Sequence, residues 1–467
     1  MLQYCSALIL LAFRRISALN WQTDYYSKFK TAEEAVSVVK SGDTVVYGEF
    51  VMASRYLDEA FFKRIGELDN IILRSTTCPF PPAVVMADKR MEHVMYNDWH
   101  FSPASRKLGD YGLCRYIPMN YHQGPRTIRT GLVGDIDVAM FMMGPPDENG
   151  YLNIGTSSSI TPEYLKFAKH VIVEINENVP KCFSDEASRV HISDIDTFVQ
   201  GPNSPLIEVP TAPPTDVDAK IAELVVSLVE NGSCIQLGIG SMPNAVGQLI
   251  GQSGLKDLGV HTEMLCDAYV SMYEGGCISG RFKKTDPGKI VYTFATGTKK
   301  LYDFLDGNEE CMIAPVDYTN DPFIIASNDK MVCLNNALEV DLFGQVASET
   351  SGYRQISGTG GQLDFLIAAA HSDGGKGLIC LSSTFTDKEG KMHSRIIPYL
   401  APNTIVTVPR SYCQYVITEY GIADLRAKTS WERAEALISI AHPDFRQELE
   451  EAAKAAHIWD WREKKVF

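Results

Sequence analysis

DAKIAELVVSLVENGSCIQLGIG, residues 218–240, contains one complete unit of an α/β fold. Its apolar residues first recur at helical spacing, and the Asn-Gly pair at 231–232 then ends the helix. A short apolar strand follows and leads into a glycine turn at residues 238–240. This order of helix, break, strand and turn is typical of mostly parallel sheets with covering helices.

The same order occurs near the start of the chain, in TAEEAVSVVKSGDTVVYGEF, residues 31–50. A Thr cap and an acidic first turn begin a helix, a break follows at Gly42, and a β-branched strand ends near Gly48. When SGDTVVYGEF is aligned with NGSCIQLGIG, the glycine and the strand stay in register. We therefore predict an α/β fold with two similar α/β domains, each with a mostly parallel sheet.

The length of 467 residues is too great for one ordinary hydrophobic core, which also favours two domains. QGPNSPLIEVPTAPPTD, residues 200–216, has five prolines and suits an extended linker. The predicted organisation is an N-terminal extension (1–20), an N-terminal domain (21–205), a Pro-rich linker (206–216) and a C-terminal domain (217–467). Core strands are predicted in HVIVEIN (170–176), MVCLNNALEVDLFG (331–344) and TIVTVP (404–409).

Composition and charge narrow the classes of function. Apolar residues at 45% and charged residues at 22% are ordinary globular values, and a net charge of −15 argues against a nucleic-acid partner. The eleven cysteines are scattered without a C-x-x-C pair, which predicts reduced thiols and no metal site. The zinc-protease H-E-x-x-H, the serine-hydrolase G-x-S-x-G and the P-loop motif do not occur.

The first 20 residues, MLQYCSALILLAFRRISALN, have an apolar run followed by two arginines. A secretory signal has its basic residues before the apolar run, and this run is too short to span a bilayer. We therefore expect a cytoplasmic protein with no membrane partner, whose folded part begins near Trp21. The alternative is a mitochondrial protein, with residues 1–20 as its presequence.

Two glycine-rich stretches are candidates for ligand binding. In QLGIGSMPNA, residues 236–245, the glycines allow close approach of a ligand to the backbone at a helix N-terminus, where Pro243 suits the first turn. Pro243 also stands where a dinucleotide-binding fingerprint has its third glycine, which argues against NAD. The second stretch, QISGTGGQLDF (355–365), again precedes an expected helix. Each stretch alone is equally typical of a turn without a ligand.

Glu263 lies between these stretches in sequence, in LGVHTEMLCD, residues 258–267. Two amide-lined turns and a carboxylate are the parts that acyl transfer requires, because amides stabilise a developing oxyanion and the carboxylate is a nucleophile. On position alone, Glu263 is also a candidate for a solvated helix-cap carboxylate.

Several longer motifs resemble one known family. The motifs are HTEM (261–264) with the upstream QLGIGxxPxAV, FMMGPPDENGYLNIGTSS (141–158), EVDLFGQVASE (339–349), SGTGGQLDF (357–365) and VITEYGIADLRAK (416–428). Together they resemble the acetyl-CoA hydrolase/transferase family, in particular its 4-hydroxybutyrate and butyryl-CoA:acetate CoA-transferases. The resemblance runs from about Trp21 to about Leu449.

The resemblance implies an active site in the cleft between the two domains, with Glu263 as the nucleophile. Glu263 would form an acyl-glutamyl anhydride and then a glutamyl-CoA thioester, which gives ping-pong kinetics without a metal. Coenzyme A would be a co-substrate, no cofactor would be bound permanently, and a homodimer or higher homo-oligomer is expected. The implied oxyanion and CoA-binding residues are Gly238, Ile239, Gly240, Ser241, Met242, Gly360 and Gly361.

Substrate choice stays open at this point. The expected partners are a short-chain acyl-CoA and a carboxylate of the acetate, butyrate or 4-hydroxybutyrate class, and propionate or succinate are alternatives. The loop at 48–62 lacks an expected proline and contains Glu49, and the aromatic segment 97–103 either contributes to the acyl pocket or packs in the core. Candidates to hold the CoA phosphates are Lys283, Lys284, Lys299, Lys300 and Arg410.

Two other functions compete with CoA transfer. In an acyl-CoA hydrolase, the same glutamate would form the same intermediate and water would take the acyl group, so the difference is how well the site excludes water. A non-catalytic acyl-CoA-binding protein would keep the fold without the chemistry.

Overall fold

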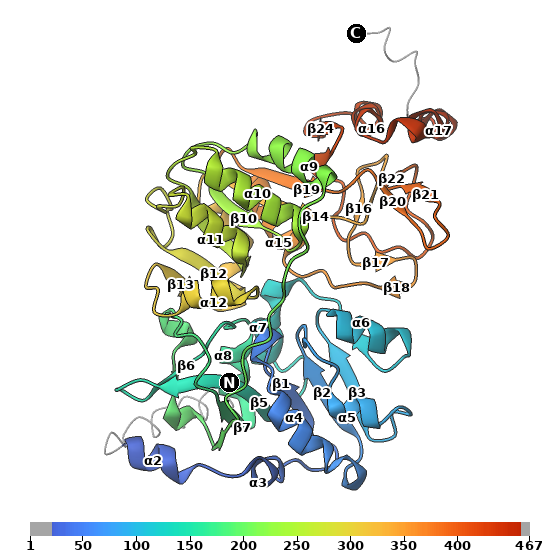
Figure 1. The fold of residues 1–467 in the computed structure, drawn as a ribbon. Coiled ribbons are helices and arrows are strands. Elements are labelled where there is room, and N and C mark those ends of the chain that lie inside the picture. Colours follow the sequence, from blue (N-terminus) through green and yellow to red (C-terminus); the bar gives the residue numbers. More distant parts are fainter. Residues whose placement is uncertain (1–20, 459–467) are drawn as a thin grey trace.

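The computed structural model describes residues 21–458, which form two halves that lie one above the other (Figure 1). The first half is built on a nine-stranded sheet in which β4, β3, β2, β1, β5, β7 and β9 are parallel neighbours in that order. β6 and β8 add an antiparallel edge to β5. The strands are β1 (Thr44–Tyr47), β2 (Ile71–Ser75), β3 (Val94–Asp98), β4 (Arg115–Tyr116), β5 (Ile136–Pro146), β6 (Tyr151–Asn153), β7 (Ala168–Ile175), β8 (Val190–His191) and β9 (Thr197–Gln200).

The second half is built on an eight-stranded sheet, in the order β13, β12, β11, β10, β14, β19, β23, β24. All neighbours are parallel except β23 and β24. The strands are β10 (Cys234–Leu237), β11 (Gly259–Leu265), β12 (Ile290–Ala295), β13 (Cys311–Ile313), β14 (Met331–Asn336), β19 (Lys376–Cys380), β23 (Tyr415–Thr418) and β24 (Gly421–Asp424).

The two sheets repeat one topology, and β1 and β10 hold equivalent places in it. Each lies in the middle of its sheet, with the next three strands of the chain on one side and later parallel strands on the other. Each follows a helix that begins with a Thr capping box, at Thr31 for α3 (Ala32–Val36) and at Thr215 for α9 (Asp216–Val226). The prediction of two similar α/β units from these two stretches is therefore confirmed.

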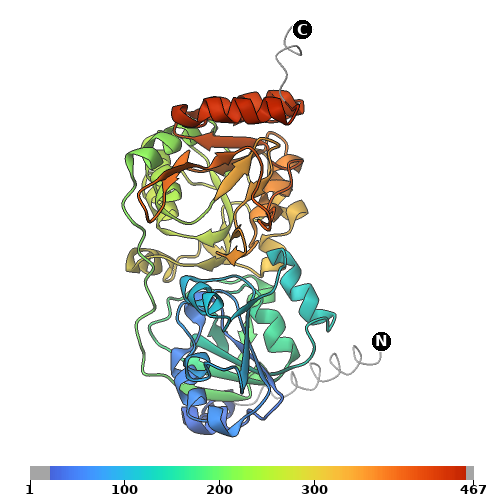
Figure 2. The ribbon, with the colours of Figure 1, turned by 90° about the vertical axis from the view of Figure 1, so that its right-hand side faces the viewer.

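Helices of the second half pack on its sheet and on one another. α10 (Ser241–Gln252) packs between α9 and α11 (Asp267–Glu274), and α15 (Gln362–His371) packs on β14 and β19. α16 (Ser430–Ser439) and α17 (Pro443–Ala455) lie at the end of the molecule farthest from the first half (Figures 1 and 2). Residues 201–215 have no regular secondary structure and run along the side of the molecule between the halves (Figure 2).

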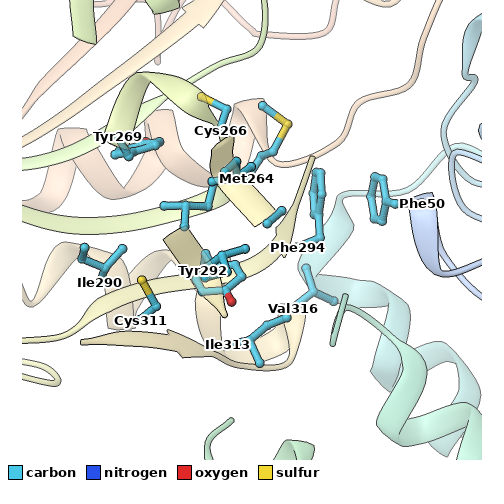
Figure 3. Close-up of a cluster of buried hydrophobic side chains, with 14 of the residues drawn as sticks. Phe50, Met264, Cys266, Tyr269, Ile290, Tyr292, Phe294, Cys311, Ile313 and Val316 are labelled. Atoms are coloured by element: carbon cyan, nitrogen blue, oxygen red, sulfur yellow. The ribbon is translucent and has the colours of Figure 1, made fainter. Parts of the chain in front are cut away.

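The two halves share apolar contacts. Phe50, just after β1, stacks on Phe294 of β12 with ring centroids 3.6 Å apart, as the close-up of this region shows (Figure 3). Both rings belong to one buried cluster that contains residues of both sheets. Burial of this apolar surface favours the docking of the two halves against each other.

Two of the three predicted core strands are present and one is not. Residues 170–176 fall largely in β7, and residues 331–344 contain β14 and β15 (Glu339–Asp341). The strand predicted at 404–409 is wrong, because only Val408 forms a bridge, to Val346, while Ile405 is 50% exposed. β-branched residues favour an extended backbone, but a strand also needs a neighbour along its length.

Within residues 21–458, no helix has the length and apolar character needed to cross a membrane. The leader at residues 1–20 lies outside the described residues, so the two alternatives for it stay predictions.

Candidate active site

A cavity of about 630 Å³ lies between the two halves, and both halves line it. Its aromatic wall comes largely from the first half, including Phe50, Trp99 and Tyr121. Its polar backbone surface comes from the second half, including Gly238, Glu263 and Gly360. A largely apolar cavity with a few converging polar groups is the usual form of a small-molecule site.

Glu263 lies near the carboxyl end of β11, the strand next to the central β10. In open α/β sheets, ligands bind in the crevice outside the carboxyl ends of the parallel strands. The Glu263 side chain is partly exposed to the cavity, and its Oε2 accepts a hydrogen bond of 2.5 Å from Nδ2 of the buried Asn320. The carboxylate is thus both reachable and held in one orientation.

Gly361 approaches this carboxylate so closely that no side chain fits there. A Cβ atom at position 361 would overlap Oε2 of Glu263 and Nδ2 of Asn320. The Gly361 amide also donates a hydrogen bond to the carboxylate. The backbone therefore supplies a donor at the place where negative charge would develop on the glutamyl oxygen.

Burial raises the pKa of Glu263 to about 7, and the negative charge of Asp364 adds to this increase. The hydrogen bonds from Asn320 and from the Gly361 amide act in the opposite direction, because they stabilise the charged form. Glu263 is therefore ionised in a substantial fraction of molecules near neutral pH, and it carries less hydration than a surface carboxylate.

Two glycine turns reach the cavity, as their positions in sequence suggest. Gly238 directly follows β10, and Gly238 and Ile239 line the cavity. Gly360, with a φ of +53°, and Gly361 precede α15 and also line it. The remaining three candidates, Gly240, Ser241 and Met242, are outside the lining, and the Met242 side chain is buried in the core.

The second glycine turn belongs to the second half but is held by the first. The Tyr121 amide donates to the Gly360 carbonyl at 3.1 Å, and the Thr359 amide donates to the Tyr116 hydroxyl at 2.9 Å. Arg106 Nε donates to the Ile356 carbonyl at 2.6 Å. The position of this turn next to Glu263 therefore depends on both halves.

A chain of polar groups behind Glu263 was missed by the sequence analysis. Asn320 follows α13 (Val316–Thr319), Asp364 lies in the first turn of α15, and His122 belongs to a 3₁₀ turn of the first half. His122 Nδ1 bonds Asp364 Oδ1 at 2.8 Å. Asp364 was within the quoted SGTGGQLDF motif, one helical turn after Gly361, and that spacing was the available signal. Asn320 and His122 had no local signal.

The loop after β1 shapes the cavity, but Glu49 does not reach it. Phe50 and Val51 line the cavity, whereas Glu49 is fully buried. Its carboxyl accepts from Ser159 Oγ and from the Ile160 amide, each at 2.8 Å. Burial raises the pKa of Glu49 to about 7 as well, so a raised pKa does not separate Glu49 from Glu263, whereas access to the cavity does.

The aromatic segment 97–103 contributes to the cavity. Trp99, His100, Ser102 and Pro103 are in the lining. Burial lowers the pKa of His100 to about 4, so its ring is neutral at physiological pH.

None of the five basic candidates for CoA phosphates is in the cavity lining. Lys283 is buried and its Nζ donates to the carbonyls of Val260 and Lys289, so it is not available to a ligand. Lys284, Lys299 and Lys300 each pair with a surface carboxylate. Arg410 is exposed on the surface.

Comparisons with known proteins agree with the architecture. Residues 14–210 match the acetyl-CoA hydrolase/transferase N-terminal domain, and residues 297–453 match the C-terminal domain of the same family. The butyryl-CoA:acetate CoA-transferase of Anaerostipes caccae is 48% identical over 94% of this chain and 99% of its own length. The 4-hydroxybutyrate coenzyme A transferase of Clostridium kluyveri is 38% identical over 92% of this chain and 98% of its own length.

Among solved structures, RipA from Yersinia pestis superposes with a TM-score of 0.86 at 32% identity, covering 94% of this chain and all of that one. Glu263 and the first glycine turn fall between the two matched domain ranges, so their placement at the site rests on the geometry described above. The match of both domains and the near full-length similarity confirm the resemblance drawn from the motifs: the chain belongs to the acetyl-CoA hydrolase/transferase family.

Proposed function

We propose that this protein transfers CoA from a short-chain acyl-CoA to a carboxylate acceptor, with Glu263 as the covalent nucleophile. The observation that carries the proposal is the Glu263 carboxylate at the cavity surface, held by Asn320 Nδ2 at 2.5 Å and by the Gly361 amide. The activities named for the relatives from Anaerostipes caccae and Clostridium kluyveri support the same reaction class.

The first half-reaction follows from these positions. The Glu263 carboxylate attacks the thioester carbonyl carbon, the carbon–sulfur bond breaks, and CoA leaves as the thiolate, which gives an acyl-glutamyl anhydride. The thiolate then attacks the glutamyl carbonyl carbon, the original acid leaves as its carboxylate, and a glutamyl-CoA thioester remains. During this second attack, the negative charge on the glutamyl oxygen lies next to Asn320 and the Gly361 amide.

The second half-reaction is the reverse with a new acid. The acceptor carboxylate attacks the glutamyl carbonyl carbon of the thioester, and CoA leaves as the thiolate, which gives a new acyl-glutamyl anhydride. The thiolate then attacks the acyl carbonyl carbon of this anhydride, and Glu263 leaves as its carboxylate. We infer that Gly238, Ile239 and Gly360 face the acyl-CoA thioester, and that the aromatic wall receives the acyl chain. A cavity of about 630 Å³ has room for chains longer than acetate, and butyrate is therefore our preferred substrate.

The test is a matrix of acyl-CoA donors against acetate, propionate, butyrate, 4-hydroxybutyrate and succinate. We expect parallel double-reciprocal lines as donor and acceptor are varied, because CoA is carried by the enzyme between half-reactions. Intersecting lines would indicate a ternary complex and would contradict the covalent mechanism. CoA release that is the same with and without an acceptor acid would identify a hydrolase instead.

The rate should also depend on pH with the sign expected for a carboxylate nucleophile. Burial raises the pKa of Glu263 to about 7, and the protonated carboxyl does not attack, so kcat/KM for the acyl-CoA should fall about tenfold per pH unit below about pH 7. Acceptor acids have pKa values near those of ordinary carboxyl groups, about 4 to 5, so they stay ionised in this range. Initial rates between about pH 5.5 and 8.5 measure this limb, and a rate independent of pH would contradict the assignment.

A further inference from the structure

The polar chain behind Glu263 crosses from one half of the molecule to the other. His122 belongs to the first half, whereas Asp364, Asn320 and Glu263 belong to the second. Asp364 is fully buried and meets His122 twice, through Oδ1 and Nδ1 at 2.8 Å and through Oδ2 and the His122 amide at 3.3 Å. Of these four residues, only Glu263 lines the cavity. The other three residues lie behind Glu263, outside the cavity lining.

Asn320 connects the two carboxylates. Its Nδ2 donates to Glu263 Oε2 at 2.5 Å, and the same side chain hydrogen-bonds Asp364. An amide between two carboxylates must turn its N–H groups toward both, because its oxygen would be repelled by either. Asn320 Oδ1 has no hydrogen-bond partner within residues 21–458, so the orientation of the amide depends on the two carboxylates alone.

Resting on the function proposed above, we propose that His122 and Asp364 form a clamp across the cleft that orients Asn320 and, through it, the Glu263 carboxylate for attack. His122 and Asp364 are positioning residues, and neither touches substrate. The clamp makes the geometry of the nucleophile depend on the first half being docked against the second.

The charges around the clamp support an ion pair. Burial lowers the pKa of His122, but its hydrogen bond to Asp364 and the charges of Asp364, Asp321 and Asp317 outweigh burial and raise this pKa. Burial raises the pKa of Asp364, and His122 and Asn320 oppose that increase. Arg129 pairs with Asp317, which leaves Asp364 as the carboxylate in direct contact with the imidazole. His100, which lines the cavity on the side of the first half, is neutral at physiological pH.

The first test is Asp364→Asn, which keeps the shape of the side chain and removes its charge. We expect kcat to fall about 10- to 100-fold with KM for butyryl-CoA changed by less than about twofold, because the nucleophile is misplaced while the cavity is intact. The acid limb of the pH profile should move to lower pH, because the negative charge of Asp364, which raises the pKa of Glu263, is lost. This shift tests whether a charged Asp364 lies next to Glu263, and the fall in kcat at unchanged KM tests the positioning.

The second test is His122→Ala. The His122 side chain is 26% exposed, so added imidazole can reach the vacated site. We expect kcat to fall about 10- to 100-fold and to recover partly and saturably with imidazole. In His122→Ala/Asp364→Asn, kcat should be no lower than in the worse single variant, since the residues act as one unit. Imidazole should not rescue this double variant, because its partner is gone.

The matched control is His371→Gln, which changes an exposed histidine in the last turn of the same helix, α15, and should leave the rate and pH profile unchanged. Unchanged kcat in both single variants, an unshifted limb in Asp364→Asn, or imidazole rescue of the double variant would each overturn the clamp. If Asp364→Asn does not fold, the His122→Ala rescue decides. A Glu263→Gln variant assayed in parallel separates the two ideas: if it is fully active, the covalent mechanism itself is wrong, and if it is inactive, the outcome concerns the clamp alone.

Discussion

Glu263→Gln is expected to lower CoA transfer by about 10³-fold or more, the scale seen when a covalent nucleophile is removed. Glutamine has nearly the same shape, but its amide is a poor nucleophile and cannot form the anhydride. The variant should still fold and bind acyl-CoA, because the apolar wall of the cavity and the two glycine turns are unchanged. Steady-state transfer rates and acyl-CoA binding by calorimetry measure the two effects separately.

A trapping experiment identifies the residue directly. Wild-type enzyme incubated with acyl-CoA and no acceptor should accumulate the glutamyl-CoA thioester, which borohydride reduces, and peptide mass spectrometry should place the change at Glu263. The control is Glu223→Gln, at an exposed position on α9, which should behave as wild type. Modification at another residue, or full activity in Glu263→Gln, would remove Glu263 from the mechanism.

Gly361→Ala is expected to lower kcat/KM by about 10²-fold or more, although only one methyl group is added. The φ of Gly361 is −97°, which alanine adopts without strain, so the loss would come from contact and not from backbone conformation. The new Cβ would overlap Glu263 Oε2 and Asn320 Nδ2, and the carboxylate would have to move. A displacement of about 1 Å at an attacking atom costs around 10²-fold.

The comparison for this variant is Gly66→Ala, where an added Cβ meets no atom of residues 21–458 within 4 Å. We expect Gly66→Ala to keep full activity and the wild-type melting temperature. Gly361→Ala should lose activity by much more than it loses stability, as thermal unfolding monitored by circular dichroism would show. Wild-type rates in Gly361→Ala would mean that the carboxylate does not occupy this position during the reaction.

The sequence by itself determined the α/β class and the duplicated unit, because helix caps, strand runs and glycine turns are local signals. The Thr capping boxes at Thr31 and Thr215 and the strands that follow them appear in the structure where the sequence predicts them. Glu263 and the two glycine turns also stood out in the sequence, since each follows a predicted strand or precedes a predicted helix. The false strand at 404–409 shows the limit, because strand pairing depends on a neighbour that local sequence does not specify.

Only the tertiary structure decided which groups surround Glu263. Asn320 lies far from Glu263 in sequence and meets it only when the second half folds, and His122 meets Asp364 only when the two halves dock. The structure also distinguished Glu49 from Glu263. Burial raises the pKa of both carboxyls to about 7, but only Glu263 lines the cavity between the halves. The sequence specifies the chemical group of each side chain, but the solvation and the partners of that group depend on the parts of the chain that fold around it.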